Sequence, residues 1–505
     1  MPRPDYDLAI IGGGINGCGI ARDAAGRGLK VLLIEQDDLA SATSSWSSKL
    51  IHGGLRYLEQ FELRLVREAL QEREVLLRIA PHIIHPLGFI LPHDAHMRPA
   101  WMVRFGLWMY DHLGGKISLP GSRGLMFPDP VYSAGLTPSV KRGFFYSDAR
   151  VDDARLTVLN AVSAREHGAG IRVRTRVVAG ERVDGIWQLE LLNVDSGERH
   201  QIRAGGVVNA AGPWVKQVLD ETLAININAQ VKLVKGSHIV VPRVHEQAHA
   251  YILQNDDKRV VFIIPYEGRY SLIGTTDVDV HSLEGTKQIT AEETAYLLHA
   301  ANRFLDKPLH ESDIVWSYAG VRPLYDDGTD NPSKTTRDYV LKVDHDGGRA
   351  PLLSIFGGKI TTYRRLAEHA LRELAPFYPQ MKKPWTGKEV LPGGDIDSLE
   401  QLTSLLTQRY AALPSDYLHA LAARQGSRAM QVLDGVNTVS DLGRQFGTGA
   451  TMLCEREIDF CIRQEWARSA EDILWRRTKC GLHMSEPERA QAASFIAQRV
   501  RALGV

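Results

Sequence analysis

The sequence predicts a mixed α/β fold (α+β overall) of two or three domains, and three observations predict it. A strand, a glycine-rich turn, a helix and a second strand follow one another within residues 5–35, which is the order of a parallel βαβ unit. Strand-like runs without intervening helices fill residues 229–275 and favour an antiparallel sheet. After residue 388 the chain becomes poor in glycine and rich in helical patterns. With 505 residues, 44% of them hydrophobic, each part can bury its own core.

The first unit carries a dinucleotide-binding fingerprint. Gly12, Gly14 and Gly17 occupy the three glycine positions between the first strand and a helix expected over 19–29. They allow a tight turn, close approach of a pyrophosphate to the backbone, and close packing of helix on strand. The helix N-terminus adds N–H donors and a positive dipole end. Glu35 ends the second strand, where a ribose hydroxyl needs an acceptor; an acid there disfavours NADP, so NAD or FAD remains.

Composition and charge argue against several classes of protein. Lysine plus arginine and aspartate plus glutamate number 60 each, so no net charge attracts nucleic acid. Four cysteines without a CxxC pair or a histidine at metal spacing predict a reducing compartment and no metal site. No segment reaches the roughly 18 to 20 apolar residues that span a bilayer, so we expect no transmembrane helix. The first strand begins near residue 5, which leaves no room for a signal peptide.

The nucleotide-binding unit is expected to be discontinuous. A charged helical pattern covers 59–80, and recurring proline and glycine between 86 and 138 interrupt the βαβ succession. Regular pattern returns with a helix over 152–167 and a strand over 170–178. A strand over 351–356 then leads into a second glycine turn and a helix over 363–374. Two helix ends aimed at one ligand fit FAD, whose pyrophosphate takes the first and whose flavin takes the second.

Six segments result from this pattern. We expect FAD-binding parts at 1–85, 145–228 and 351–390, a substrate- or membrane-facing excursion at 86–144, a substrate domain at 229–350 and a helical C-terminal domain at 391–505.

Four clusters of residues could carry chemistry. In the first, Ser44, Ser45 and Lys49 offer partners for phosphate oxygens, and His52, Arg56 and Tyr57 lie within a few positions of paired glycines. A serine-rich surface turn is the alternative there. The other three are His238 at a strand start, Arg322 in an aromatic turn and Lys359 in the second glycine turn. The alternative interpretations of these three residues are a structural histidine, a surface ion pair and a solvated loop cation.

Several motifs together resemble one known family. GGGINGCGIARDAAGRG, SSKLIHGGLRYLE, VNAAGPW, LVKGSHIVVPR, GVRPL and FGGKITTYRRLAE are similar to the FAD-dependent aerobic glycerol-3-phosphate dehydrogenases, above all to their bacterial membrane-associated branch. The resemblance covers nearly the whole chain. It implies a discontinuous Rossmann-like FAD domain, an antiparallel-sheet substrate domain, a helical C-terminal domain, noncovalent FAD and a homodimer. It also implies oxidation of glycerol 3-phosphate to dihydroxyacetone phosphate, with electrons passed to ubiquinone.

The clusters found above fit that reaction. Arg56 and Arg322, with Tyr57, are expected at the substrate phosphate, and Lys359 at the C2 oxygen or the flavin N5 region. His238 is the first choice for the base that accepts the hydroxyl proton, and His52 is the second. The expected FAD contacts are Gly12, Gly14, Asn16, Gly17, Glu35, Thr43, Ser44, Ser45, Lys49, His52, Gly53, Ala211, Gly212, Gly357, Gly358, Lys359, Thr361 and Thr362.

Quinone lies in the bilayer, so an enzyme with this activity must touch a membrane, here the cytoplasmic face of the inner membrane. The candidate residues mix aromatic rings with cations, as interfacial segments do: Arg98, Trp101, Arg104, Phe105, Trp108, Tyr110, Lys116 and Arg123. A buried helix of the substrate domain explains the same pattern equally well. The calcium-binding C-terminal extension of mitochondrial relatives is missing, so we expect no calcium regulation.

Three other readings stay open at this point. A glycerol-3-phosphate oxidase, which passes electrons to oxygen, shares the flavin and substrate residues. An NAD-linked dehydrogenase has no need of the second glycine turn. A flavin-binding module without turnover has no need of three cations directed at phosphate.

Overall fold

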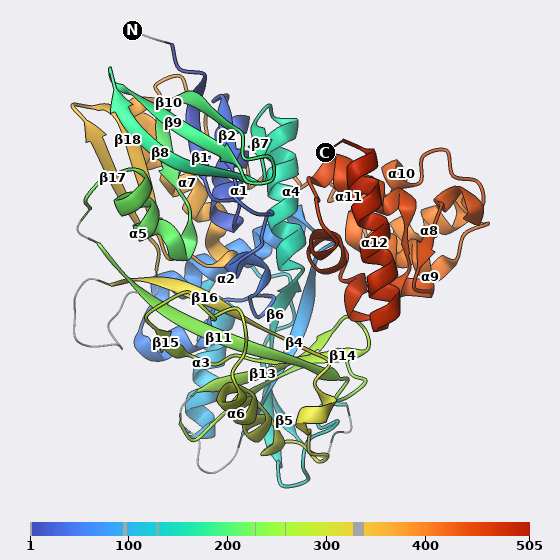
Figure 1. Ribbon diagram of the computed structural model, residues 1–505. Coiled ribbons are helices and arrows are strands. Elements are labelled where there is room, and N and C mark those ends of the chain that lie inside the picture. Colours follow the sequence, from blue (N-terminus) through green and yellow to red (C-terminus); the bar gives the residue numbers. More distant parts are fainter. Residues whose placement is uncertain are drawn as a thin grey trace.

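The computed structural model describes residues 3–93, 98–127, 129, 131–227, 229–257, 259–326 and 338–504, without the side chains of Arg56, Glu59 and Gln60. Two large sheets lie one above the other, and a group of helices from the end of the chain stands beside them (Figure 1). The predicted mixed fold, with a helical C-terminal part, is confirmed. The predicted segment boundaries stay a prediction.

The first sheet has eight strands, with the order β17-β18-β10-β1-β2-β7 and with β8 and β9 beside β10. Its strands are β1 (Tyr6–Ile11), β2 (Val31–Ile34), β7 (Gly170–Arg172), β8 (Thr175–Val183), β9 (Ile186–Asn193), β10 (Arg199–Asn209), β17 (Val340–Asp346) and β18 (Arg349–Phe356). The pairs β1–β10, β1–β2, β10–β18 and β2–β7 are parallel. Three distant stretches of sequence therefore build this sheet, as the discontinuous pattern predicted.

Helices α1 (Ile15–Gly26), α4 (Asp153–Glu166) and α7 (Tyr363–Leu374) pack together against this sheet, and their apolar side chains share one core with it. Helix α1 begins earlier than the sequence predicted, because it starts directly after Gly14. The strand expected over 170–178 is two strands. Arg174 adopts a positive φ of 51° between them, and this breaks the extended backbone.

The second sheet has ten strands, with the order β15-β11-β14-β13-β12-β4-β6-β3, with β16 beside β11 and β5 beside β6. Its strands are β3 (Leu50–Ile51), β4 (Ile84–His93), β5 (Arg123–Met126), β6 (Arg142–Val151), β11 (Gln230–Pro242), β12 (Ala250–Gln254), β13 (Val260–Tyr266), β14 (Tyr270–Gly274), β15 (Val278–Val280) and β16 (Trp316–Asp326). All its pairs are antiparallel except β12–β4. Helix α6 (Ala291–Asn302) covers one face of this sheet. Strands from the first excursion and from the predicted substrate domain therefore build a single sheet.

Two helices pack beside the second sheet. Helix α2 (Leu63–Ile79) starts later than the charged pattern predicted, because a 3-10 turn over Leu55–Gln60 precedes it and Phe61 has a positive φ of 59°. Helix α3 (Ala100–Leu113) packs against both this turn and α2. Among the described residues, no helix combines the length and apolarity needed to cross a bilayer.

The C-terminal part is helical and packs around its own apolar core (Figure 1). Its helices are α8 (Leu399–Arg409), α9 (Ser415–Gln425), α10 (Ala429–Val432), α11 (Glu455–Glu465) and α12 (Glu486–Ala502). Strands β19 (Gln445–Phe446) and β20 (Leu453–Cys454) form a small hairpin, and a π-helical turn over Asp472–Arg477 faces the first sheet.

Candidate active site

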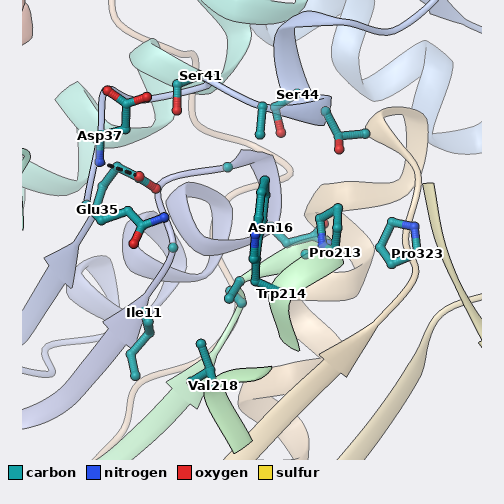
Figure 2. Close-up of a pocket in the computed structure, with 18 of the residues that line it drawn as sticks. Ile11, Asn16, Glu35, Asp37, Ser41, Ser44, Pro213, Trp214, Val218 and Pro323 are labelled. Atoms are coloured by element: carbon teal, nitrogen blue, oxygen red, sulfur yellow. Dashed lines mark hydrogen bonds between the residues drawn. The ribbon is translucent and has the colours of Figure 1, made fainter. Parts of the chain in front are cut away.

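A cavity of about 470 Å³ lies at the carboxyl ends of the parallel strands, where open α/β sheets bind their ligands. Figure 2 shows that its walls come from distant parts of the chain: Asn16 and Glu35 from the first unit, Pro213 and Trp214 after β10, and Pro323 from β16. The lining also includes these predicted FAD contacts: Gly12, Gly14, Thr43, Ser44, Ala211, Gly212, Gly357 and Gly358.

The N-terminus of α1 opens onto this cavity. Gly14 is the N-cap and has no side chain to cap the helix. Ser44 Oγ accepts one N–H of the first turn, that of Ile15, at 2.9 Å. A Cβ on Gly17 would lie 1.9 Å from the Gly12 carbonyl oxygen, so only glycine lets this helix end approach the strand. The arrangement leaves backbone donors and the positive end of the helix dipole for an anion.

Glu35 lies beside the glycine turn. Its two carboxylate oxygens accept the backbone N–H groups of Gly13 at 2.6 Å and Asp37 at 2.8 Å, and Figure 2 shows the contact with Asp37. Burial raises the pKa of Glu35 to about 7, against the lowering effect of these two hydrogen bonds. A half-buried carboxylate with lone pairs to spare suits ligand hydroxyl donors, as the sequence predicted for a ribose.

The two glycine turns meet at this cavity. Asn16 Nδ2 donates to the Gly357 carbonyl at 3.2 Å, and a Cβ on Gly358 would lie 2.8 Å from that nitrogen. The Oδ1 atom of Asn16 is buried and has no hydrogen-bond partner among the described residues. A helix N-terminus, a carboxylate, an unsatisfied amide oxygen and a second glycine turn in one cavity fit FAD.

One face of the second sheet carries the predicted chemical residues. Between β11 and β16, His238 pairs with Tyr318, and Val234 pairs with Arg322. The two pairs are four residues apart on each strand, which is an even number. Tyr318 and Arg322 therefore share a face with His238. Gly236 and Gly320 pair with each other between them. Glycine at these two positions lets Thr275 and Trp46 pack closely over the strands between the imidazole and the guanidinium.

His238 is almost fully buried. Its ring stacks on Tyr318 with centroids 4.8 Å apart, and its Nε2 lies 2.9 Å from Ser48 Oγ. Its Nδ1 has no partner among the described residues. Burial, and then the charges of Lys49 and Arg322, lower the pKa of His238 to about 3. The ring is therefore neutral at physiological pH and able to accept a proton.

A second group surrounds His52. Lys359 Nζ lies over the Tyr57 ring, 3.7 Å from its centroid. The backbone N–H of His52 donates to Thr361 Oγ1 at 3.3 Å. Burial is the main cause that lowers the pKa of His52; the Lys359 charge lowers it and Asp148 opposes both. His52, Tyr57, Lys359 and Thr361 thus gather where the first sheet meets the second.

A row of paired residues joins the two groups. Gly274 on β14 pairs with His238 on one side and with Phe262 on the other. A Cβ on Gly274 would lie 2.1 Å from His238 Cδ2, so the glycine makes room for the imidazole. Phe262 contacts His52 edge-on at 6.5 Å. Both candidate bases therefore border the same stretch of sheet surface.

Other predicted contacts have partners within the protein. Lys49 is buried, and its Nζ lies 2.8 Å from both Asp153 Oδ1 and the Ser45 carbonyl. Arg322 forms an ion pair with Asp277 and donates to the Thr276 carbonyl at 3.2 Å. Thr43 Oγ1 donates to the Val321 carbonyl at 2.6 Å. These contacts tie the 43–49 segment to the strands that carry His238 and Arg322.

Three further predicted residues have separate outcomes. Gly53 N–H donates to Tyr110 OH at 2.8 Å. Thr362 is buried where α7 begins. The side chain of Arg56 lies outside the described residues, so its place at the phosphate stays a prediction.

Sequence reasoning missed several residues that shape this region. Ser48, Asp148, Phe262, Gly274 and Asp277 each contact or face a predicted residue. Strand alternation from His238 and Arg322 predicts only neighbours on the same strand, whereas these five come from other elements. No group of three or more His, Cys, Asp or Glu side chains in the described part of the chain could hold a metal ion.

Comparison with known proteins agrees with this geometry. Residues 7–364 match the FAD dependent oxidoreductase family, and residues 385–501 match the C-terminal domain of alpha-glycerophosphate oxidase. The aerobic glycerol-3-phosphate dehydrogenase of Escherichia coli is 50% identical over 493 residues, which cover 97% of each chain. The chain belongs to the FAD-dependent glycerol-3-phosphate dehydrogenase family.

Two further relatives extend the comparison. The D-erythritol 1-phosphate dehydrogenase of Brucella abortus is 51% identical over 493 residues, again 97% of each chain. The structure of glycerol-3-phosphate dehydrogenase from Bacillus halodurans, complexed with FAD, superposes with a TM-score of 0.73 at 25% identity and covers 98% of this chain and 94% of its own. This member of the family is an FAD-dependent oxidoreductase, as the sequence motifs indicated, and FAD is its cofactor.

Proposed function

We propose that this enzyme oxidises sn-glycerol 3-phosphate to dihydroxyacetone phosphate and passes the electrons to ubiquinone. The observation that carries the substrate is the pairing of a neutral, buried imidazole with a half-exposed arginine on one sheet face. A secondary alcohol that also bears a phosphate needs both groups. The name of the Escherichia coli relative supports the same substrate.

The residues take distinct roles in this proposal. FAD supplies the hydride acceptor. Arg322, with Arg56 and Tyr57, binds the substrate phosphate, and Lys359 orients the C2 oxygen. His238 accepts the C2 hydroxyl proton on its free Nδ1 or on Nε2, with His52 as the second candidate. Tyr318 stacks on the imidazole and fixes the plane of its ring.

A membrane surface is part of the proposal because ubiquinone lies in the bilayer. On α3, the exposed side of the helix carries Trp101, Phe105 and Trp108, which are 68%, 55% and 49% exposed. Tyr110 differs from the expectation: it is 1% exposed and its hydroxyl donates to Asp148. Phe61 in the neighbouring turn, 86% exposed, extends the apolar surface that we propose enters the interface.

The cations around this surface favour an anionic membrane. Arg98, Arg104 and Lys116 are exposed, and Arg104 reaches Ser122 Oγ at 2.8 Å. The exposed rings on α3 argue against the alternative of a wholly buried helix. We propose the cytoplasmic face of the inner membrane as the place where this surface docks.

An anaerobic absorption spectrum tests substrate and cofactor together. Bleaching of the flavin bands on addition of glycerol 3-phosphate is the expected result, and unchanged bands in a yellow, folded preparation would contradict the substrate. Oxygen uptake with and without a ubiquinone analogue then separates the proposed dehydrogenase from a glycerol-3-phosphate oxidase. Rapid peroxide formation without quinone would favour the oxidase, which the C-terminal family match keeps as the second candidate.

A longer polyol phosphate is a further candidate substrate. The Brucella abortus relative named for D-erythritol 1-phosphate is as similar to this chain as the Escherichia coli glycerol-3-phosphate dehydrogenase is. Side-by-side kcat/KM values for the two phosphates decide between them. A higher value for D-erythritol 1-phosphate would replace the proposed substrate and leave the chemistry unchanged.

A further inference from the structure

A buried ion-pair network joins the C-terminal helices to the FAD cavity. Asp38 is 1% exposed. Its two carboxylate oxygens accept hydrogen bonds from Arg477 at 2.7 and 2.8 Å and from Arg476 at 2.7 Å. Both arginines belong to the π-helical turn Asp472–Arg477, more than 430 residues further along the chain. Asp38 lies three residues after the ribose acceptor Glu35.

The network has a second branch. Arg174, at the positive-φ position between β7 and β8, forms ion pairs with both Asp37 and Asp472. Asp472 in turn accepts from Arg476 at 2.5 Å. The backbone N–H of Arg174 donates to the Asp37 carbonyl at 3.0 Å. Residues 37 and 38 are therefore held by their side chains and by their backbone.

This segment controls the surroundings of Glu35. The Asp37 N–H donates to one Glu35 oxygen at 2.8 Å (Figure 2). Asp37 also lines the cavity beside Glu35. A shift of residues 37 and 38 would remove that donor and leave Glu35 with one hydrogen bond. Burial raises the pKa of Glu35, and the neighbouring Asp37 and Asp38 carboxylates also raise it.

We propose that Arg476 and Arg477 are positioning residues for FAD: through Asp38, the C-terminal helices hold the 35–38 segment in the conformation in which Glu35 accepts the ribose hydroxyls. The C-terminal part is thus a determinant of cofactor affinity as well as a separate folding unit. The chemistry recognised is the adenosine half of FAD, which ADP shares.

Arg477→Met tests the proposal, because it removes the charge and keeps an apolar stem of similar length. Apoenzyme prepared from the holoenzyme is titrated with FAD, and flavin fluorescence gives the Kd; ADP is titrated as a competitor. We expect Kd for both ligands to rise by about 10- to 100-fold, and Arg477→Lys to recover part of the loss. The matched control is Arg424→Met, which breaks a largely buried pair with Glu457 inside the C-terminal part and should change Kd by less than about twofold.

A double-mutant cycle separates positioning from general destabilisation. In a Glu35→Gln background the ribose acceptor is already impaired, so adding Arg477→Met should change the FAD Kd by less than about threefold. Full additivity of the two substitutions overturns the proposal, as does an Arg477→Met Kd equal to that of wild type or of Arg424→Met. If Arg477→Met does not fold, Asp38→Asn breaks the same contact from the FAD side, and a wild-type Kd for FAD in that variant overturns the proposal equally.

Discussion

Arg322→Ala is the most direct test of the proposed substrate site. The Arg322 side chain is 42% exposed and its partner Asp277 is 31% exposed, so water reaches both members of the ion pair. We expect the substitution to raise the KM for glycerol 3-phosphate strongly while FAD stays bound. The reason is that no described contact joins Arg322 to the residues around the helix end of α1.

The expected fall in kcat/KM follows from the contacts that the Arg322 guanidinium gains and gives up when phosphate binds. A bidentate contact with phosphate contributes two charge-assisted hydrogen bonds of about 1.5 to 3 kcal/mol each. Binding gives up the ion pair with Asp277, which is worth about 0 to 1 kcal/mol at this exposure. The net loss on truncation is about 2 to 6 kcal/mol, and kcat/KM should fall by about 30- to 20,000-fold.

The assay is steady-state kinetics with a dye as electron acceptor, together with the flavin absorbance of the purified protein. Asp277→Asn is the matched control, since it breaks the same ion pair and keeps the cation; its KM should stay equal or fall. Glycerol is the second control because it lacks the phosphate, so Arg322→Ala should leave its kcat/KM unchanged. A fall of less than fivefold with glycerol 3-phosphate, an equal fall with glycerol, or loss of flavin would refute the reasoning.

Three further predictions use other parts of the structure. Trp101→Ser combined with Trp108→Ser should reduce recovery with anionic liposomes at least tenfold in a folded protein, because it removes the two most exposed indoles of α3; unchanged recovery means that α3 is not the anchor. Gly17→Ala should abolish FAD retention, since its Cβ would overlap the strand backbone, whereas Gly106→Ala, with nothing within 4 Å, should retain FAD. The depressed pKa of His238, about 3, means that protonation inactivates this base only as pH falls toward that value. A profile of log kcat against pH should therefore show no ionisation of His238 near 6.5. If the wild-type profile bends near pH 6.5 and the bend is absent in His238→Gln, the imidazole has an ordinary pKa and the prediction is wrong.

Local patterns in the sequence predicted much of the fold. Helix α7 has the bounds that the sequence predicted, and α4 lies within one residue of them. In each case apolar spacing and a nearby cap or glycine determine the helix within one stretch of chain. The same locality explains one part of the FAD cavity, because its helix end, turn and acid follow one another within the first 35 residues.

Errors arose where a distant contact decides the backbone. Arg174 interrupts a predicted strand while its side chain reaches Asp37 and Asp472. The Nζ of Lys49, a predicted FAD contact, lies beside Asp153 in a buried ion pair, and its part in phosphate binding stays a prediction. Tyr110 was placed at a membrane surface, although its hydroxyl is buried against Asp148. A short stretch of sequence contains the side chain but not the distant residue that it contacts in the folded protein.

The sequence by itself determined the kind of ligand and the chemistry on offer, because a glycine turn, an acid-ended strand and a few cations and histidines are properties of short segments. Only the tertiary structure decided which of them act together. His238 and His52 border the same sheet surface through the pairing of β11, β14 and β13, and Asp38 contacts Arg477 because the chain returns to its own beginning near its end. These long-range contacts depend on strand register and domain packing, which the burial of apolar surface across the whole molecule determines.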